Sequence, residues 1–174
     1  MVIEIERRFI VEGEDWRNFS ESPQEFRQGY LASEINGWNI RIRILGKEKA
    51  LLTLKIKTKS LLANHEFEYE IPMNDAENIW KMTTDRIYKT RSYVHFSNKK
   101  WVIDCFQKQN HPLVIAEIEL NSEEEIIEIP KWCIEEITGQ YQWSNASLAK
   151  SPINIFTIED RLLEGSKKKG HSLL

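Results

Sequence analysis

Acidic and basic side chains alternate with apolar ones at the start of the chain. In the stretch VIEIERRF (residues 2–9), Glu4, Glu6 and Arg8 fall at every second position. Successive side chains of a β-strand point to opposite faces, so this spacing places two carboxylates and a guanidinium side by side on one face. Such a row can be the solvated side of an ordinary sheet, or it can bind a metal ion and a phosphate group.

Charges with the same spacing recur along the chain. The further basic members are Arg41, Arg43, Lys55, Lys57, Lys89 and Arg91, and the further acidic members are Glu66, Glu68, Glu70, Asp104, Glu117 and Glu119. An antiparallel sheet normally alternates polar and apolar residues, so each strand alone fits a solvated face. Taken together the strands fit it less well, because like charges that lie close together repel unless a neighbouring strand or a ligand supplies the opposite sign.

The two sets of charges suit the two halves of one kind of ligand. Arginine and lysine bind phosphate oxygens, and arginine can do so bidentately. Clustered carboxylates suit Mg²⁺ or Mn²⁺, which are hard cations that take oxygen ligands. The pattern therefore predicts a surface that binds a polyphosphate together with a divalent metal.

Eight segments with strand-like alternation carry these charges. They are residues 2–11, 28–34, 38–45, 49–58, 65–72, 87–96, 100–106 and 113–120. Most connections between them are short, which favours antiparallel pairing, and eight strands can remove their edges by closing into a barrel. The predicted fold is α+β and mainly β: a closed eight-stranded antiparallel barrel with a charged lumen and helices packed outside.

Helical patterns are fewer and lie mostly late in the chain. A helical turn is predicted at residues 15–19, and a helix at residues 74–83 with Asn74 as its N-cap. Three more helical patterns come later in the chain. The first begins with a capping box at Ser122, the second opens at Pro130 and ends at Gly139, and the third is a short helix over residues 144–149 with a Ser or Asn cap.

The chain shows no internal repeat and no break in composition, so residues 1–164 are expected to form one domain. Residues 165–174 (GSKKKGHSLL) lack periodicity and are predicted to be a disordered tail or a remnant of cloning.

Composition limits the class of protein. Among 174 residues, 24 are basic and 27 acidic, for a net charge of −3, which gives no basic footprint for duplex nucleic acid. Cys105 and Cys133 are too few and too far apart for a zinc site or a disulfide framework. No signal-like segment and no long apolar run is present, so we expect a cytoplasmic protein without a membrane partner, either a monomer or a homodimer.

Taken in order, a series of short blocks resembles one known family. The blocks are EIERR (4–8), QGYL (28–31), IRIR (40–43), LTLK (52–55), EFEYEIP (66–72), KTR (89–91), AEIEL (116–120), EEITG (135–139) and WSNASLA (143–149). The first is similar to the ExExK signature of the CYTH proteins, also called triphosphate tunnel metalloenzymes, and the series covers the chain to about residue 150. The resemblance implies an eight-stranded barrel, open at both ends, that hydrolyses triphosphates. The length and blocks resemble the short bacterial branch, whose members are often inorganic tripolyphosphatases.

The resemblance also implies roles for individual residues. The metal ligands would bind two Mg²⁺ or Mn²⁺ ions: Glu4 and Glu6 with one of Glu117 and Glu119 would hold the first, and Asp104 with the other of that pair would hold the second, which would deliver the attacking water. The phosphate-binding residues would be Arg8, Arg41, Arg43, Lys55, Lys57, Lys89 and Arg91, with Glu66 and Glu68 in support. Lys89, paired with Tyr30, would be either a general base or one more phosphate contact.

Two positions depart from the family pattern, and other functions stay open. Arg8 replaces the family's lysine, and Lys57 stands near a position where many relatives have glycine. The alternatives are a class IV adenylate cyclase, a thiamine or nucleoside triphosphatase, and a non-catalytic module that binds polyphosphate or nucleotide. Cyclase relatives usually carry a His-Phe start before the signature, whereas this chain starts with Met-Val-Ile.

Overall fold

The computed structural model describes residues 2–35 and 37–153, which form nine strands. The strands are β1 (Val2–Val11), β2 (Gln24–Ile35), β3 (Trp38–Leu45), β4 (Lys49–Lys57), β5 (Ala63–Glu70), β6 (Arg86–Phe96), β7 (Lys99–Phe106), β8 (Val114–Glu119) and β9 (Cys133–Glu136). Eight of them correspond to the predicted segments. The predicted tail at residues 165–174, and the end of the predicted domain before it, lie outside the described residues.

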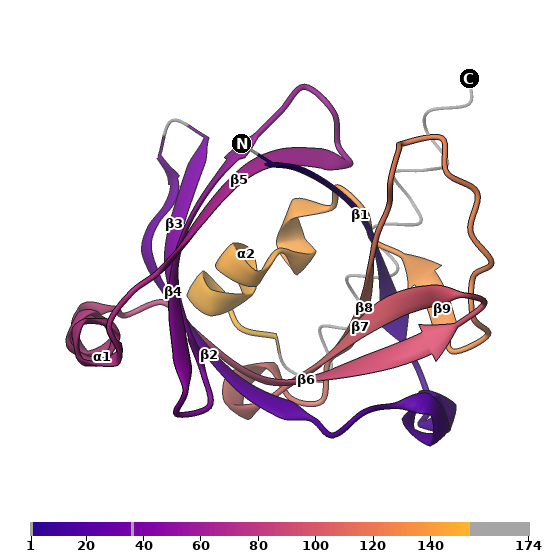
Figure 1. The fold of residues 1–174 in the computed structure, drawn as a ribbon, viewed down its shortest axis with the longest axis horizontal. Helices are drawn as coiled ribbons and strands as arrows, with labels where there is room; N and C mark the ends of the chain where they lie inside the picture. The colour runs from indigo at the N-terminus through magenta and orange to yellow at the C-terminus, as the bar shows by residue number, and fades with distance from the viewer. Residues whose placement is uncertain (1, 36, 154–174) are drawn as a thin grey trace.

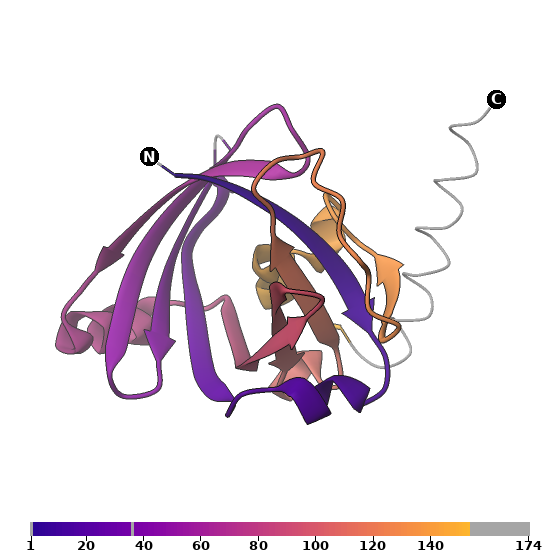
Figure 2. The ribbon, with the colours of Figure 1, turned by 45° about the vertical axis from the view of Figure 1, so that its right-hand side comes forward.

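The eight long strands close into a barrel. Around the ring the order is β1-β5-β4-β3-β2-β6-β7-β8, and β8 pairs again with β1, with every pairing antiparallel. Figures 1 and 2 show this ring from two directions. The predicted closed antiparallel barrel is confirmed.

The pairing register places opposite charges next to each other on the inner face. Arg8 lies opposite Glu117, and Arg91 opposite Asp104. Lys55 lies opposite Glu66. Neighbouring strands therefore supply much of the compensation that the like-charged pairs within each strand require.

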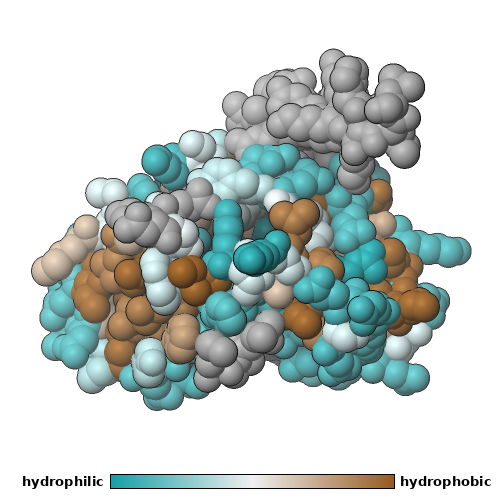
Figure 3. Space-filling model, turned by 90° about the horizontal axis from the view of Figure 1, so that it is seen from above, coloured by the Kyte–Doolittle hydropathy of each residue, from teal (hydrophilic) through white to brown (hydrophobic). Residues whose placement is uncertain are grey.

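Apolar residues on the outer face are covered in two places. Helix α1 (Met73–Met82) packs Ala76 and Trp80 against Ile42 and Ile44 of β3. A second cluster lies under β9 and the short helix η1 (Asp15–Phe19), and it joins Trp16, Trp101 and Trp132 with Phe9, Val94 and Ile118. In the view from above, hydrophobic residues gather toward the sides of α1 and β9, and hydrophilic ones dominate between them (Figure 3).

The last helix lies inside the ring of strands. Helix α2 (Asn145–Lys150), which follows the short helices η2 (Lys108–Asn110) and η3 (Tyr141–Trp143), is enclosed by the barrel wall (Figure 1). At this end the inward positions become apolar, and Ile10, Ile87, Phe106 and Ile115 pack with Trp143 and Leu148. The expected helices outside the barrel are thus α1 and the short helix η1, whereas α2 and its apolar neighbours fill one end of the lumen, which the family resemblance implied would be open.

Several local predictions need correction. The predicted helix after Pro130 is strand β9, which pairs with the end of β1 beyond the part that β5 covers. Free backbone groups on that edge of β1 explain why pairing overrides the local helical pattern. Glu125 caps a turn by accepting from the Asn121 amide rather than opening a helix, and α1 begins after Pro72 without a side-chain cap from Asn74.

The short helix at residues 144–149 is confirmed as α2, with Ser144 as its cap, which accepts a hydrogen bond from the Ser147 amide. Among the described residues, no helix is long and apolar enough to cross a membrane.

Candidate active site

A cavity of about 760 Å³ occupies the charged part of the lumen. That volume falls within the range of small-molecule sites. Its lining includes most residues that the sequence singled out: Glu4, Glu6, Arg8, Tyr30, Arg41, Arg43, Lys55, Lys57, Glu66, Glu68, Arg91, Glu117 and Glu119. Asn145 and Ala146 of α2 form part of its inner end. Lys89 and Asp104 also lie on the inner face but do not line the cavity, and both are almost fully buried.

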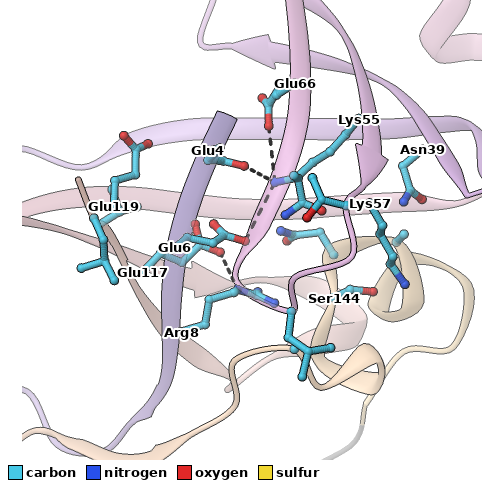
Figure 4. Close-up of a pocket in the computed structure, with 18 of the residues that line it drawn as sticks. Glu4, Glu6, Arg8, Asn39, Lys55, Lys57, Glu66, Glu117, Glu119 and Ser144 are labelled. Carbon is cyan, nitrogen blue, oxygen red and sulfur yellow. Dashed lines mark hydrogen bonds and ion pairs between the residues drawn. The ribbon is translucent and has the colours of Figure 1, made fainter. Parts of the chain in front are cut away.

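The acidic side of the cavity surrounds Lys55. The Lys55 ammonium contacts Glu4 Oε2, and it lies 3.4 Å from Glu66 Oε2 and 3.9 Å from Glu6 Oε1 (Figure 4). Burial alone would lower the pKa of Lys55, but the carboxylates of Glu6, Glu4 and Glu66 raise it above its usual value. Lys55 is therefore held as a cation among three acidic side chains.

Even with Lys55 in place, this side carries excess negative charge. Glu6 lies opposite Glu119 in the β1–β8 register, so two like charges face each other. Burial raises the pKa values of Glu4, Glu6 and Glu119, and neighbouring carboxylates raise them further. Carboxylates that repel one another in this way are suited to bind a hard divalent cation. Among the described residues, however, no three acidic, His or Cys side chains already converge to hold one.

The adjoining part of the cavity, called its basic side here, is rich in guanidinium groups. Arg41 Nη2 lies 3.6 Å from Glu66 Oε1, and Arg43 Nη1 lies 3.5 Å from Glu68 Oε1. Burial lowers the pKa of Arg43 to about 10, and the nearby Arg41 and Arg91 contribute to the shift. Arg8 Nη2 and Arg41 Nε are buried without a hydrogen-bond partner among the described residues. Crowded cations with spare donors are suited to an anion with several oxygens.

A buried network of ion pairs extends along the inner face from the cavity residues Arg8, Arg91 and Glu117 to Lys89 and Asp104. Arg91 donates to both oxygens of Asp104, with Nε 2.8 Å from Oδ1 and Nη2 2.7 Å from Oδ2, and Lys89 Nζ lies 2.5 Å from Oδ2. Arg91 Nη2 also reaches Glu117 Oε2 at 3.1 Å, and Arg8 Nε donates to Glu117 Oε1 at 3.0 Å. Burial alone would raise the pKa of Asp104, but Arg91 and Lys89 hold it well below its usual range. A metal ion at Asp104 would have to displace these cations.

Lys89 and Tyr30 have different partners in this structure. Lys89 Nζ contacts Asp104 and, at 3.3 Å, Asn145 Oδ1. Burial lowers the pKa of Lys89 to about 8, with Arg91 adding to the shift against the opposing effect of Asp104. Tyr30 interacts with Arg41, and burial raises the pKa of its phenol. Lys89 does not line the cavity itself, but it contacts Asn145, which does.

Three polar residues that the sequence analysis did not single out belong to this site. Gln28 accepts from Arg43 Nε at 3.2 Å, Thr53 donates to Glu68 at 2.9 Å, and Asn145 contacts Lys89. Gln28 and Thr53 could have been found, because each stands two positions before a selected residue of the same strand. Asn145 carried no such signal, since its short helix follows cap chemistry rather than strand alternation.

The fold and the lined cavity define a β-barrel whose interior is a charged binding site. The model of the CYTH domain family matches residues 2–151. The chain therefore belongs to the CYTH domain family.

Relatives and a solved structure agree with this assignment. The inorganic triphosphatase of Acetivibrio thermocellus is 34% identical over 155 residues, covering 88% of this chain and 97% of that protein. The inorganic triphosphatase of Nitrosomonas europaea is 30% identical over 152 residues, covering 85% of this chain and 97% of that protein. The crystal structure of the inorganic triphosphatase NE1496 matches with a TM-score of 0.62 and 30% identity, covering 88% of this chain and 99% of that one.

Proposed function

We propose that this protein hydrolyses inorganic tripolyphosphate to pyrophosphate and phosphate with the help of a divalent metal. The observation that carries the proposal is the division of one cavity into an under-compensated acidic side and a crowded basic side. A polyphosphate bound with a divalent cation supplies the opposite charge to both sides. The similarity to two proteins named inorganic triphosphatase supports the same reaction.

We assign the metal to the acidic side of the cavity. Glu4, Glu6 and Glu119 would hold Mg²⁺ or Mn²⁺, with Glu117 at the border of the basic side, and their raised or crowded carboxylates fit a hard cation. Such an ion supplies charge neutralisation on phosphate oxygens and activates water for the attack. The sequence-based proposal of a second ion at Asp104 is less well supported, because both oxygens of Asp104 are engaged by Lys89 and Arg91. We propose Asp104 instead as a positioning residue for those two cations.

The basic side would orient the phosphates. Arg41 and Arg43 project from one strand, and Arg8 and Arg91 enter from the Glu117 side, so a chain of phosphates can be bound from two directions. In phosphoryl transfer the protein acts mainly by positioning and by stabilising the charge of the transferred group. Guanidinium groups already fixed by ion pairs provide both without reorganising during the reaction.

The aromatic residues of the cavity favour an inorganic substrate over a nucleotide. The aromatic side chains in its lining are Tyr30, Tyr93 and Tyr141, as far as the described residues show. Tyr30 is buried against Arg41, Lys100 lies 3.8 Å over the ring of Tyr93, and Lys57 lies 5.3 Å from the ring centre of Tyr141. Because Tyr30 is buried and a cation already lies over one face of Tyr93 and near Tyr141, none of these rings offers a base two free faces.

The proposal is tested by measuring phosphate release from tripolyphosphate, ATP, thiamine triphosphate and pyrophosphate, each with Mg²⁺, with Mn²⁺ and with a chelator. We expect tripolyphosphate to be the fastest substrate and the chelator to stop turnover. Cyclic AMP as the product from ATP would indicate a cyclase, and binding of tripolyphosphate without turnover would indicate a non-catalytic module. Either result would overturn the proposed function.

A further inference from the structure

Lys55 takes the place at which the acidic side of the cavity would otherwise hold a metal. The ion pairs described for Glu4 and Glu6 both go to the Lys55 ammonium, which comes from β4 and reaches across to β1. Glu66 of β5 adds a third carboxylate at 3.4 Å. Figure 4 shows the three acidic groups directed at this one nitrogen. The Lys55 ammonium therefore occupies the space between these three carboxylates. No three side chains among the described residues are already arranged to hold a metal.

An ammonium and a divalent cation would compete for these oxygens. Two positive charges this close repel each other strongly in a partly buried site, where water screens them little. We therefore expect a metal that binds at Glu4 and Glu6 to displace Lys55. Its flexible stem of four carbons permits such a movement without a change in the barrel.

Lys55 has a second set of partners within reach. Glu66 contacts both Lys55 at 3.4 Å and Arg41 at 3.6 Å, so Lys55 stands at the border between the acidic side and the basic side. An ammonium released from Glu4 and Glu6 would find phosphate oxygens on the side of Arg41. The same residue can therefore neutralise carboxylates in the ligand-free protein and bind phosphate in the loaded one.

We propose that Lys55 is an internal counter-ion that occupies the metal site of the ligand-free protein, leaves it when the metal binds, and is then free to contact the polyphosphate. The proposal rests on the proposed function for the identity of the two ligands. Its consequence is a positive coupling: a phosphate that attracts Lys55 frees Glu4 and Glu6 for the metal, and a metal frees Lys55 for the phosphate. Such coupling is reciprocal by thermodynamic necessity.

The test measures Mn²⁺ affinity in the absence of any phosphate, from the electron paramagnetic resonance signal of free Mn²⁺. Lys55→Met should bind Mn²⁺ at least about tenfold more tightly than the wild type, because the competing cation is gone. Lys55→Arg keeps a cation and should stay close to the wild type. Lys59→Met removes an exposed lysine from the lining of the same cavity, and screening should keep its effect within about twofold.

Unchanged or weaker Mn²⁺ binding by a folded Lys55→Met variant would overturn the proposal. A second measurement uses the wild type, in case that variant does not fold. In protein with ¹⁵N-labelled lysines, the ammonium resonance of Lys55, identified by its loss in Lys55→Arg, should shift when Mg²⁺ is added. Saturation with Mg²⁺ that leaves this resonance in place would equally refute displacement. Neither measurement involves turnover, so a protein that fails to hydrolyse tripolyphosphate can still confirm the role of Lys55, and an active one can refute it.

Discussion

Two groups of carboxylates on the same inner face of the barrel have opposite electrostatic character. Asp104 is fully buried, and Arg91 and Lys89 hold its pKa well below the usual range. Glu6 and Glu119 face each other across β1 and β8, and burial together with neighbouring carboxylates raises their pKa values. The difference lies in the number of cations that the strand register brings to each group. It separates a carboxylate compensated by two cations from carboxylates that carry excess negative charge, which we propose bind the metal.

The strongest way to break this contrast is to remove the compensated carboxylate. Asp104→Ala leaves Lys89 and Arg91 buried without their partner, so we expect the free energy of unfolding to fall by about 3–5 kcal/mol. Denaturant unfolding monitored by circular dichroism measures the change. A loss below about 1 kcal/mol would mean that the two cations find other partners and that the network is not structural.

The same experiment on the other group should give the reverse result. Glu6→Gln removes one of two facing negative charges, so the variant should fold with unchanged or slightly greater stability. Its metal-dependent phosphate release should nevertheless fall more than about 100-fold, because a ligand charge is lost. Full activity in this variant would show that the paired glutamates are only a solvated face of the sheet.

Lys89 tests whether the buried network also takes part in the chemistry. A base accepts a proton only when it is neutral, so a lysine with a pKa lowered to about 8 predicts activity that rises as the pH increases through that value. Lys89→Arg keeps the charge but cannot lose its proton, and it should lower turnover about 100-fold or more.

Because arginine is larger than the buried lysine that it replaces, a control must show that Lys89→Arg is folded. Thermal unfolding of the variant should show a single cooperative transition. Activity at saturating Mg²⁺ with an unchanged pH profile in Lys89→Arg would end the proposal of a base and leave Lys89 as a structural cation or a phosphate contact.

The smallest expected effect is a difference in how the stability of the protein depends on pH. It distinguishes the carboxylates with raised pKa values from Asp104 in mildly acidic solution. A raised pKa means that protonation favours the folded state, so the contribution of Glu4 and Glu6 is fully present below their unfolded pKa and is lost as the pH rises through the folded one. Asp104 has a lowered pKa, so its contribution persists above its unfolded pKa and is lost only on stronger acidification. On acidification from neutral pH to about pH 5, protonation of the first group therefore begins before that of Asp104.

We therefore expect the wild type to gain less than about 1 kcal/mol of stability from this group over that interval at low salt, and Glu6→Gln to gain less than the wild type. Urea unfolding of both proteins at each pH measures the difference. Equal slopes for the two proteins would show that Glu6 does not carry the excess charge.

The sequence could predict which residues share the inner face, but not how they compensate one another. Alternation of Glu4, Glu6 and Arg8 with apolar residues predicts the strand and its inward side, because the period of a strand is two. Whether a carboxylate meets a cation or another carboxylate depends on the register between strands, which the turns and the closure of the barrel decide. For this reason Asp104 and Glu119 looked equivalent in the sequence and differ in the structure.

Two other features were beyond local patterns for related reasons. Strand β9 forms because β1 extends beyond β5 and offers an unpaired edge, which depends on strands far apart in the sequence. The placement of α2 inside the barrel depends on the apolar residues Ile87 and Phe106 at one end of the lumen. Each lies on a strand that also presents charged residues such as Lys89, Arg91 and Asp104 to the interior, so the strand patterns alone did not indicate an apolar floor.

This apolar floor closes the cavity at one end. Because α2 and its apolar neighbours fill one end of the lumen, a linear polyphosphate bound as proposed would enter with one terminus first and would not pass through the barrel. Under the proposed function, the products would leave through the same opening. The enzyme should then act on the ends of a longer polyphosphate chain and not on its internal bonds.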